Sequence, residues 1–119
     1  MVFGTIIALS MSVQTGCYYD NEEDLYPFSN VCDTSNVTLS GTVKPVLQGN
    51  CYACHNASAA GAAGAGINLE DYNSLKGWVD NGKLLCAIEQ GNGCSPMPKG
   101  GTRLPQCTID KIKVWVAAG

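Results

Sequence analysis

Cysteine is the residue that most constrains this chain, because seven of its 119 residues are cysteines and only one is a histidine. This cysteine content is well above that of an ordinary cytosolic domain, and a chain of this length is expected to form a single domain. Seven cysteines cannot all pair with one another, so at least one must be free or modified. A single histidine excludes sites that need two imidazole ligands, which include most catalytic zinc sites.

Charge and composition exclude two further classes of protein. The formal net charge is −3, which argues against nucleic acid as a partner because binding phosphates requires a basic surface. Charged residues make up only 14% of the chain and hydrophobic residues 45%, so a disordered polyelectrolyte is excluded. All seven basic residues but only five of the ten acidic ones fall within residues 41–119. We therefore expect a slightly basic folded part that follows an acidic N-terminal part.

The N-terminal segment has the character of an export signal. Residues 1–19 carry no charged side chain, and residues 2–13 read VFGTIIALSMSV. A span of the bilayer takes about 20 apolar residues, whereas a shorter apolar run is typical of the core of a secretory signal. We assign residues 1–16 to this signal segment, although the usual basic residues before the core are missing. Export implies an oxidising compartment, in which disulfides persist.

Residues 14–17, Gln-Thr-Gly-Cys, resemble the lipobox of bacterial lipoproteins, with Gln14 where that motif prefers leucine. The resemblance implies cleavage before Cys17 and a lipid on its sulfur, which would anchor the chain to a membrane without a spanning helix. The location would then be the bacterial periplasm or cell envelope. The alternative is an ordinary signal peptide, after which Cys17 forms a disulfide. Residues 17–40, with five acidic and no basic side chains, are interpreted as a lipidated acidic tether.

The motif that carries the chemistry is CYACH at residues 51–55, an example of CxxCH, the pattern of covalent haem attachment. At this spacing, Cys51 and Cys54 can add to two neighbouring vinyl groups of a porphyrin, and His55 can bind the iron from the same side. A thioredoxin-like redox pair would usually follow a strand in a βαβ unit, and a zinc ribbon would need a second CxxC. The sequence shows neither pattern.

Met97 is the candidate for a second iron ligand. It lies in the run Ser-Pro-Met-Pro-Lys at residues 95–99, whereas Met1 and Met11 belong to the signal segment. A methionine of a hydrophobic core would more often lie in a periodic apolar pattern. Because each proline restricts the backbone around it, this loop presents Met97 instead of packing it. The sequence therefore predicts His55 and Met97 as the two axial ligands.

Residues 41–119 resemble the small class I c-type cytochromes, in particular their bacterial lipoprotein members. The likeness rests on the CxxCH motif, the methionine loop and the C-terminal segment with Ile112 and Trp115. It implies an all-α, cytochrome c-like fold of about four short helices, with irregular loops, around one covalently bound haem c. It also implies a non-enzymatic one-electron carrier that meets a redox partner protein, because two axial ligands leave no open position on the iron. Two alternatives stay open, a fixed haem subunit of a larger membrane respiratory complex and a haem-free, disulfide-stapled binding module.

The resemblance also implies the surroundings of the haem. Class I cytochromes carry Gly-Pro-x-Leu after the motif, and residues 66–69, Gly-Ile-Asn-Leu, resemble it with isoleucine in place of proline. The carbonyl of Ile67 would then accept the Nδ1–H of His55, and Leu69 would form a wall of the haem site. Either Trp78 or Lys83 could bond a haem propionate, although an ordinary core or surface role fits them as well. Residues 57–66, ASAAGAAGAG, are either a flexible linker or a loop that lets the backbone approach the haem edge.

Helices are expected from residue 43 into the motif, over residues 70–78 and 83–90, and at the C-terminus. The C-terminal helix has Thr108 as its expected N-cap and an apolar stripe that includes Ile109 and Ile112. A turn is expected at residues 80–82, Asp-Asn-Gly. Lys99 and Arg103 near the methionine loop are expected either to attract an acidic partner or to be ordinary solvated side chains.

Four cysteines remain for disulfides, and they allow three ways of pairing. We favour Cys86–Cys94, which closes a short loop before Met97, together with Cys32–Cys107, which joins the tether to the C-terminal helix. The alternative is that some of these cysteines stay as buried free thiols.

Overall fold

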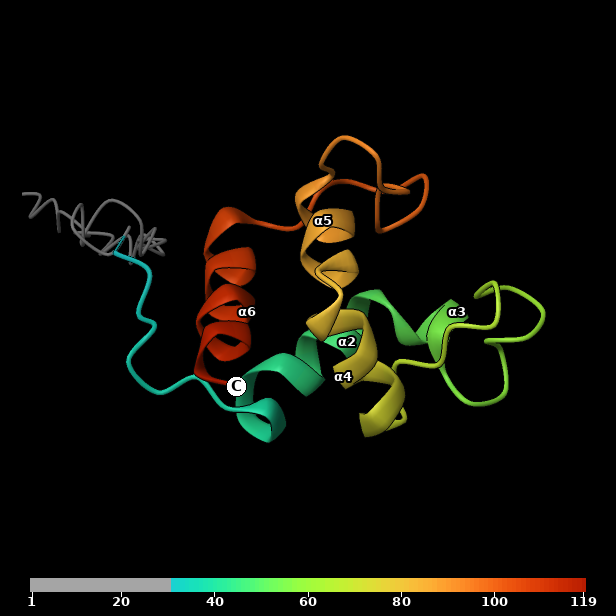
Figure 1. The fold of residues 1–119 in the computed structure, drawn as a ribbon. Helices are drawn as coiled ribbons and strands as arrows, with labels where there is room; N and C mark the ends of the chain where they lie inside the picture. The colour runs from blue at the N-terminus through green and yellow to red at the C-terminus, as the bar shows by residue number, and fades with distance from the viewer. Residues whose placement is uncertain (1–30) are drawn as a thin grey trace, which may run out of the picture. The chain divides into compact units, whose positions relative to one another are not determined.

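The computed structural model describes residues 31–119, and within them Val31–Gly119 forms one compact unit. All regular structure in this part of the chain is helical, as the sequence predicts (Figure 1). The predicted signal segment, Cys17 and the tether up to residue 30 lie outside the described residues. No helix of the described part is both long and apolar enough to cross a membrane.

The helical segments of the first half lead directly into the CxxCH motif. The π-helix η1 (Leu39–Val43) is capped by Thr38, whose side-chain oxygen accepts a hydrogen bond from a backbone N–H in the first turn. Helix α2 (Lys44–Asn50) continues from it with Pro45 in its first turn, where proline costs no helical hydrogen bond. A single turn, α3 (Tyr52–His55), carries the histidine. The helical run therefore begins four residues earlier than the sequence predicts, in a π-helical turn.

Two short helices follow close to the predicted positions, and the first begins and ends two residues later than predicted. Helix α4 (Tyr72–Asp80) begins after Asp71, whose carboxylate accepts a hydrogen bond of 2.8 Å from the backbone N–H of Ser74. Helix α5 (Lys83–Glu89) starts directly after Gly82. That glycine has φ +74°, a backbone conformation that other residues rarely adopt. The predicted turn between the two helices is confirmed.

The C-terminal helix α6 (Gln106–Ala118) begins earlier than expected. The prediction of Thr108 as its N-cap is wrong, because Pro105 occupies the N-cap position and Thr108 lies inside the first turn. Proline suits this position, since its ring fixes φ near the helical value and a helix start needs no donor there. Ile109 and Ile112 are almost completely buried, so the apolar stripe of this helix faces the core as predicted.

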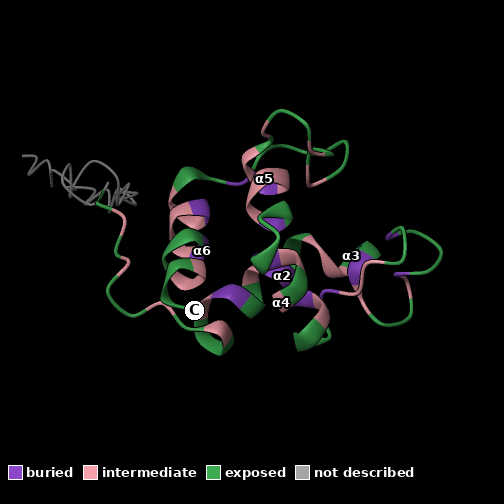
Figure 2. Cartoon of the chain, in the orientation of Figure 1, coloured by how far each residue is buried: buried purple, intermediate pink, exposed green. Residues whose placement is uncertain are grey.

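The core lies where α6 meets η1 and α5 and where α4 meets α5. Buried positions lie on the sides of these helices that face one another (Figure 2). Trp115 is partly buried and packs against this core. The buried core residues are Val43, Leu47, Leu69, Leu75, Val79, Leu84, Ile88, Leu104, Ile109 and Ile112.

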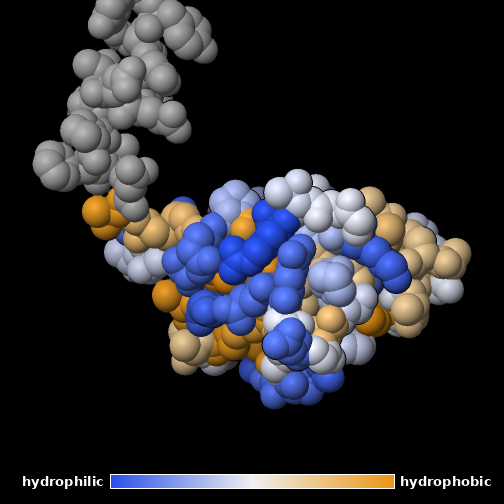
Figure 3. Space-filling view, turned by 90° about the horizontal axis from the view of Figure 1, so that it is seen from above, coloured by the Kyte–Doolittle hydropathy of each residue, from blue (hydrophilic) through white to orange (hydrophobic). Residues whose placement is uncertain are grey.

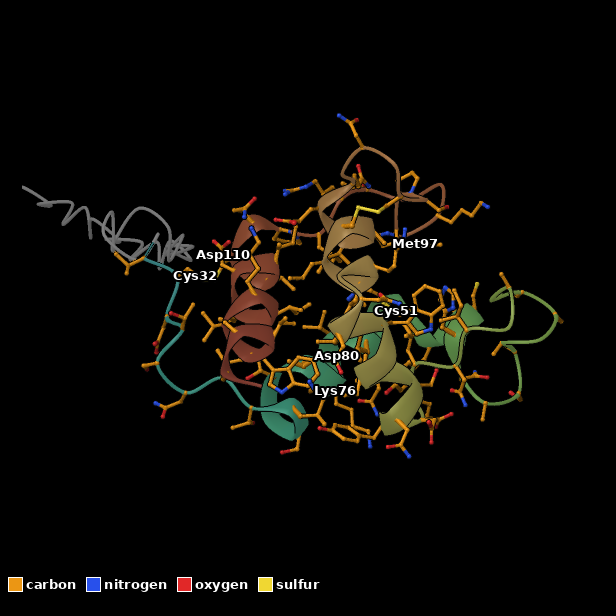
Figure 4. All side chains as sticks on the ribbon, viewed as in Figure 1. Cys32, Cys51, Lys76, Asp80, Met97 and Asp110 are labelled. Atoms are coloured by element: carbon orange, nitrogen blue, oxygen red, sulfur yellow. A yellow bond between two sulfur atoms is a disulfide. The ribbon has the colours of Figure 1, made fainter. Side chains whose placement is uncertain are left out.

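Two disulfides cross-link the fold in the pairing that the sequence favours. Cys32–Cys107 joins residues 75 positions apart, with 5.3 Å between the Cα atoms, and connects the N-terminal side of the unit to α6. Cys86–Cys94 spans only 8 positions, with 5.9 Å between the Cα atoms, and connects α5 to residues 90–105, which we call the Met97 loop (Figure 4). Val37 packs against the core as well. Residues before position 41 therefore belong to the compact unit.

Candidate functional site

A cavity of about 770 Å³ lies between the CxxCH turn, the loop that follows it, α5 and the Met97 loop. Cys51 and Met97 approach it from different parts of the fold (Figure 4). Trp78 and Lys83 also line it, and no aspartate or glutamate of the described residues does. All six residues that the sequence predicts as cofactor-binding line this one cavity, namely Cys51, Cys54, His55, Ile67, Leu69 and Met97.

His55 is held in a fixed orientation on one side of the cavity. The residue is buried, and its Nδ1 lies 3.0 Å from the carbonyl oxygen of Ile67. In the tautomer that satisfies both groups, Nδ1–H donates to this carbonyl. The other ring nitrogen, Nε2, makes no hydrogen bond to any described residue and is left available to bind a metal ion. The contact between Ile67 and the imidazole is the one expected from the sequence.

Gly64 lets the following loop come close enough to make that contact. A Cβ atom at this position would lie 2.3 Å from the backbone oxygen of Cys54 and 2.9 Å from Nδ1 of His55. These separations are too short for any side chain, so only glycine fits. Nothing in the sequence distinguishes Gly64 from the neighbouring glycines. The available signal was the run of small residues 57–66, read there as one that could allow a close backbone approach.

Leu69 closes the same loop against the motif. Its N–H donates to the carbonyl oxygen of His55 at 2.8 Å, and the side chain is buried against the cavity. The hydroxyl of Tyr52 lies 3.5 Å from the carbonyl oxygen of Leu69. Both backbone groups of Leu69 are therefore tied to the turn that carries the histidine, and the position of this wall depends on contacts within residues 51–69.

The two thiols of the motif are free and do not form a disulfide with each other. Cys54 is exposed, whereas Cys51 is partly buried, and its burial raises the pKa of the thiol from 9.0 to about 11. Thiols of redox pairs and metal-binding thiolates have lowered pKa values. The environment of Cys51 therefore favours its thiol form over the thiolate. Within residues 31–119, no three His, Cys, Asp or Glu side chains form a group that could hold a metal ion.

Met97 reaches the cavity from the second half of the chain. Its backbone N–H donates to the carbonyl oxygen of Ala87 in α5 at 3.0 Å, and its side chain is partly buried. Cys94, which is bonded to α5 through its sulfur, lines the cavity as well. The methionine is therefore placed by contacts to a helix that is remote in sequence from the CxxCH turn.

The surface near the cavity is mixed in polarity. Seen from above, hydrophilic residues cover the centre of the described surface, and hydrophobic residues lie at its left and right margins (Figure 3). Lys99 lines the cavity, but Arg103 does not. The guanidinium of Arg103 instead bonds the carbonyl oxygen of Glu89 and the side chain of Gln106. Of the two basic residues that were expected near the methionine, only Lys99 thus lies at the cavity.

No family model, no curated protein and no solved structure matches this chain. The function of the cavity is therefore inferred from its own residues.

Proposed function

We propose that this protein carries single electrons through one covalently attached haem c, and that its helical domain is related to the class I c-type cytochromes. The observation that supports this most strongly is the meeting of two sequence signals in one cavity. The thiols and imidazole of the CxxCH motif and the thioether of Met97 lie far apart in the chain, yet they line the same space. A disulfide-stapled binding module would not require that coincidence.

The residues around the cavity fit a haem in chemical type. Apolar side chains such as Leu69, Leu84 and Ile88 offer contacts to a flat apolar ring. Lys83 and the indole of Trp78 offer donors for its carboxylates. When bound, the haem supplies an iron atom that changes between Fe(II) and Fe(III). Cys51 and Cys54 are the residues that would form the two thioether bonds.

The chain contributes two axial ligands and their orientation. Nε2 of His55 would bind the iron while the Ile67 carbonyl holds Nδ1–H, which fixes the tautomer and makes the imidazole a stronger ligand. Met97 would also hold the iron, through its thioether, and such ligation raises the reduction potential. With both ligands in place, no coordination position is open, and the site favours electron transfer over oxygen binding or peroxide chemistry.

The location is part of the proposal. Cys17 would carry a lipid that anchors the domain to a membrane of the bacterial cell envelope, with the tether between them. Growth with a labelled fatty acid tests this. Label is expected on the wild-type protein and absent from Cys17→Ser, whereas label on neither protein contradicts the lipid anchor.

Two measurements on the purified protein test the function. Haem stain is expected to stay with the chain on a denaturing gel, and the oxidised protein is expected to show a low-spin spectrum and to take up one electron reversibly. Met97→Ala should keep the stain but lose that low-spin spectrum, while Thr102→Ala, an exposed control in the same loop, should keep both. An unstained chain contradicts the proposal and favours the binding module. Co-elution with other proteins after detergent extraction would favour a subunit of a larger complex over a free carrier.

A further inference from the structure

We propose that the C-terminal turn of α5 positions Met97 by fixing the Met97 loop at three points, so that Cys86, Cys94 and Arg103 are positioning residues for the distal ligand. The inference rests on the proposed function, because it assigns Met97 to the iron. It goes further because it proposes that residues which do not touch the iron determine how firmly Met97 stays bound to it. It also predicts that one of the two disulfides controls the site and the other does not.

The first fixed point is the disulfide Cys86–Cys94. It ties the loop to the last turn of α5 three residues before Met97, with 5.9 Å between the two Cα atoms (Figure 4). At the base of this small ring, the N–H of Gly91 donates to the carbonyl oxygen of Cys86 at 2.9 Å. A cross-link so close in sequence to the ligand limits how far the loop can swing away.

The second fixed point is the backbone of the ligand itself. The N–H of Met97 donates to the carbonyl oxygen of Ala87 at 3.0 Å, and Ala87 follows Cys86 directly in the helix. The covalent bond and this hydrogen bond therefore act on neighbouring residues of one turn. Leu84 and Ile88 bury the inner side of the same helix in the core, so the helix is a firm support for both.

The third fixed point lies at the far end of the loop. Nε of Arg103 donates to the carbonyl oxygen of Glu89 at 3.3 Å, and the guanidinium also bonds the side chain of Gln106 at 3.0 Å. The carboxylate of Glu89 forms an ion pair with Lys113 of α6. The loop therefore leaves and returns to the same turn of α5, and that turn is linked to α6.

Apart from Leu104, which is buried in the core near the end of the loop, the loop has little else to hold it. Most of its residues are exposed, and one of its few internal backbone hydrogen bonds joins the N–H of Gly101 to the carbonyl oxygen of Pro98 at 3.1 Å. An exposed segment with few buried contacts opens at a low free-energy cost. The fixed points on α5 raise the free-energy cost of opening the loop. The higher this cost is, the larger the fraction of molecules in which Met97 would bind the iron.

The experiment compares the two disulfides in the purified haem protein. Cys86→Ser/Cys94→Ser removes the cross-link beside Met97, and Cys32→Ser/Cys107→Ser removes the one that joins α6 to the N-terminal side. Imidazole, which competes with Met97 for the oxidised iron, should bind about tenfold more tightly to the first variant and within about twofold of wild type to the second. Hydrogen exchange at the Met97 amide should accelerate by about tenfold in the first variant alone.

The imidazole affinity and the exchange rate at Met97 each support or overturn the inference. Wild-type imidazole affinity and Met97 exchange in Cys86→Ser/Cys94→Ser would overturn it, and so would equal changes in both disulfide variants, which would show an effect of overall stability. If the first variant does not fold, Arg103→Gln decides instead. It should accelerate exchange at Met97 by about twofold to threefold, with Thr102→Ala unchanged, and an unchanged rate contradicts the inference. Absence of covalent haem would overturn the proposed function, while the exchange rates would still test the fixed points.

Discussion

The two sides of the cavity are built in different ways. On the side of His55, the histidine is buried and its ring is bonded to the Ile67 carbonyl within one short stretch, residues 51–69. On the side of Met97, the methionine sits in a mostly exposed loop that is fixed to α5 by a disulfide and by individual hydrogen bonds. One side depends on close packing of local backbone, and the other depends on a few individual bonds to a helix.

The difference predicts which substitutions each side tolerates. Where backbone atoms are in close contact, one added carbon disrupts the structure, because protein interiors have little free space. Where a loop is held by separate bonds, removing one of them weakens the position of the ligand but leaves the fold in place. In the proposed haem protein, His55 is thus expected to be the permanent ligand and Met97 the exchangeable one.

The largest expected effect on stability lies outside both sides of the cavity. Cys32→Ser/Cys107→Ser opens a cross-link between residues 75 positions apart, so it should lower the free energy of unfolding by about 4.5 kcal/mol. Urea denaturation measures this. The Met97 amide should keep its wild-type exchange rate in this variant, and a faster rate would contradict a separate, local support for the methionine.

Gly64→Ala should disrupt the packing of the loop against the CxxCH turn on the His55 side. Its Cβ would lie 2.3 Å from the backbone oxygen of Cys54, and we expect a loss of about 3 kcal/mol in the free energy of unfolding, because backbone must move. The matched control is Gly61→Ala in the same loop, whose Cβ meets nothing within 4 Å. The control should be as stable as wild type or slightly more so. Equal stability of the two variants would contradict the close approach.

Cys86→Ser/Cys94→Ser should cost less than either change. The bond closes a loop of only 8 positions, and the expected loss in the free energy of unfolding is about 2.5 kcal/mol. Urea denaturation of the two disulfide variants side by side measures the difference. A loss as large as that in Cys32→Ser/Cys107→Ser would mean that the short cross-link supports the whole fold and not the Met97 side alone.

The smallest effect is expected at Arg103. Its bonds to Glu89 and Gln106 are exposed, so Arg103→Gln should lower the free energy of unfolding by about 0.5–1 kcal/mol. Thermal denaturation beside Thr102→Ala measures this. A loss above about 2 kcal/mol would place Arg103 among the residues that hold the fold, which would weaken the contrast between the two sides.

Local sequence signals predicted much of this structure. The glycine turn at residues 80–82, the helices around it and the buried stripe of α6 follow from residues that are near one another in the chain. The start of α6 differs from the prediction because Thr108 is a good N-cap by type, while Pro105 takes the N-cap position, where no backbone N–H is needed.

Features that depend on distant contacts were less visible. Gly64 could be recognised only in three dimensions, because its constraint comes from the backbone oxygen of Cys54. Arg103 looked like a surface charge, and only the fold brings it to the end of α5. The cavity residues could be predicted because the CxxCH motif and the methionine loop each indicate candidate residues by residue type and spacing. The fold brings these two segments together at one cavity.

A mass measurement on one peptide tests whether haem is attached to the CxxCH motif. The purified protein is denatured, its free thiols are alkylated, and the peptide that contains Cys51 and Cys54 is weighed. The peptide is expected to carry one haem and no alkyl group. A peptide with two alkyl groups and no haem would contradict it.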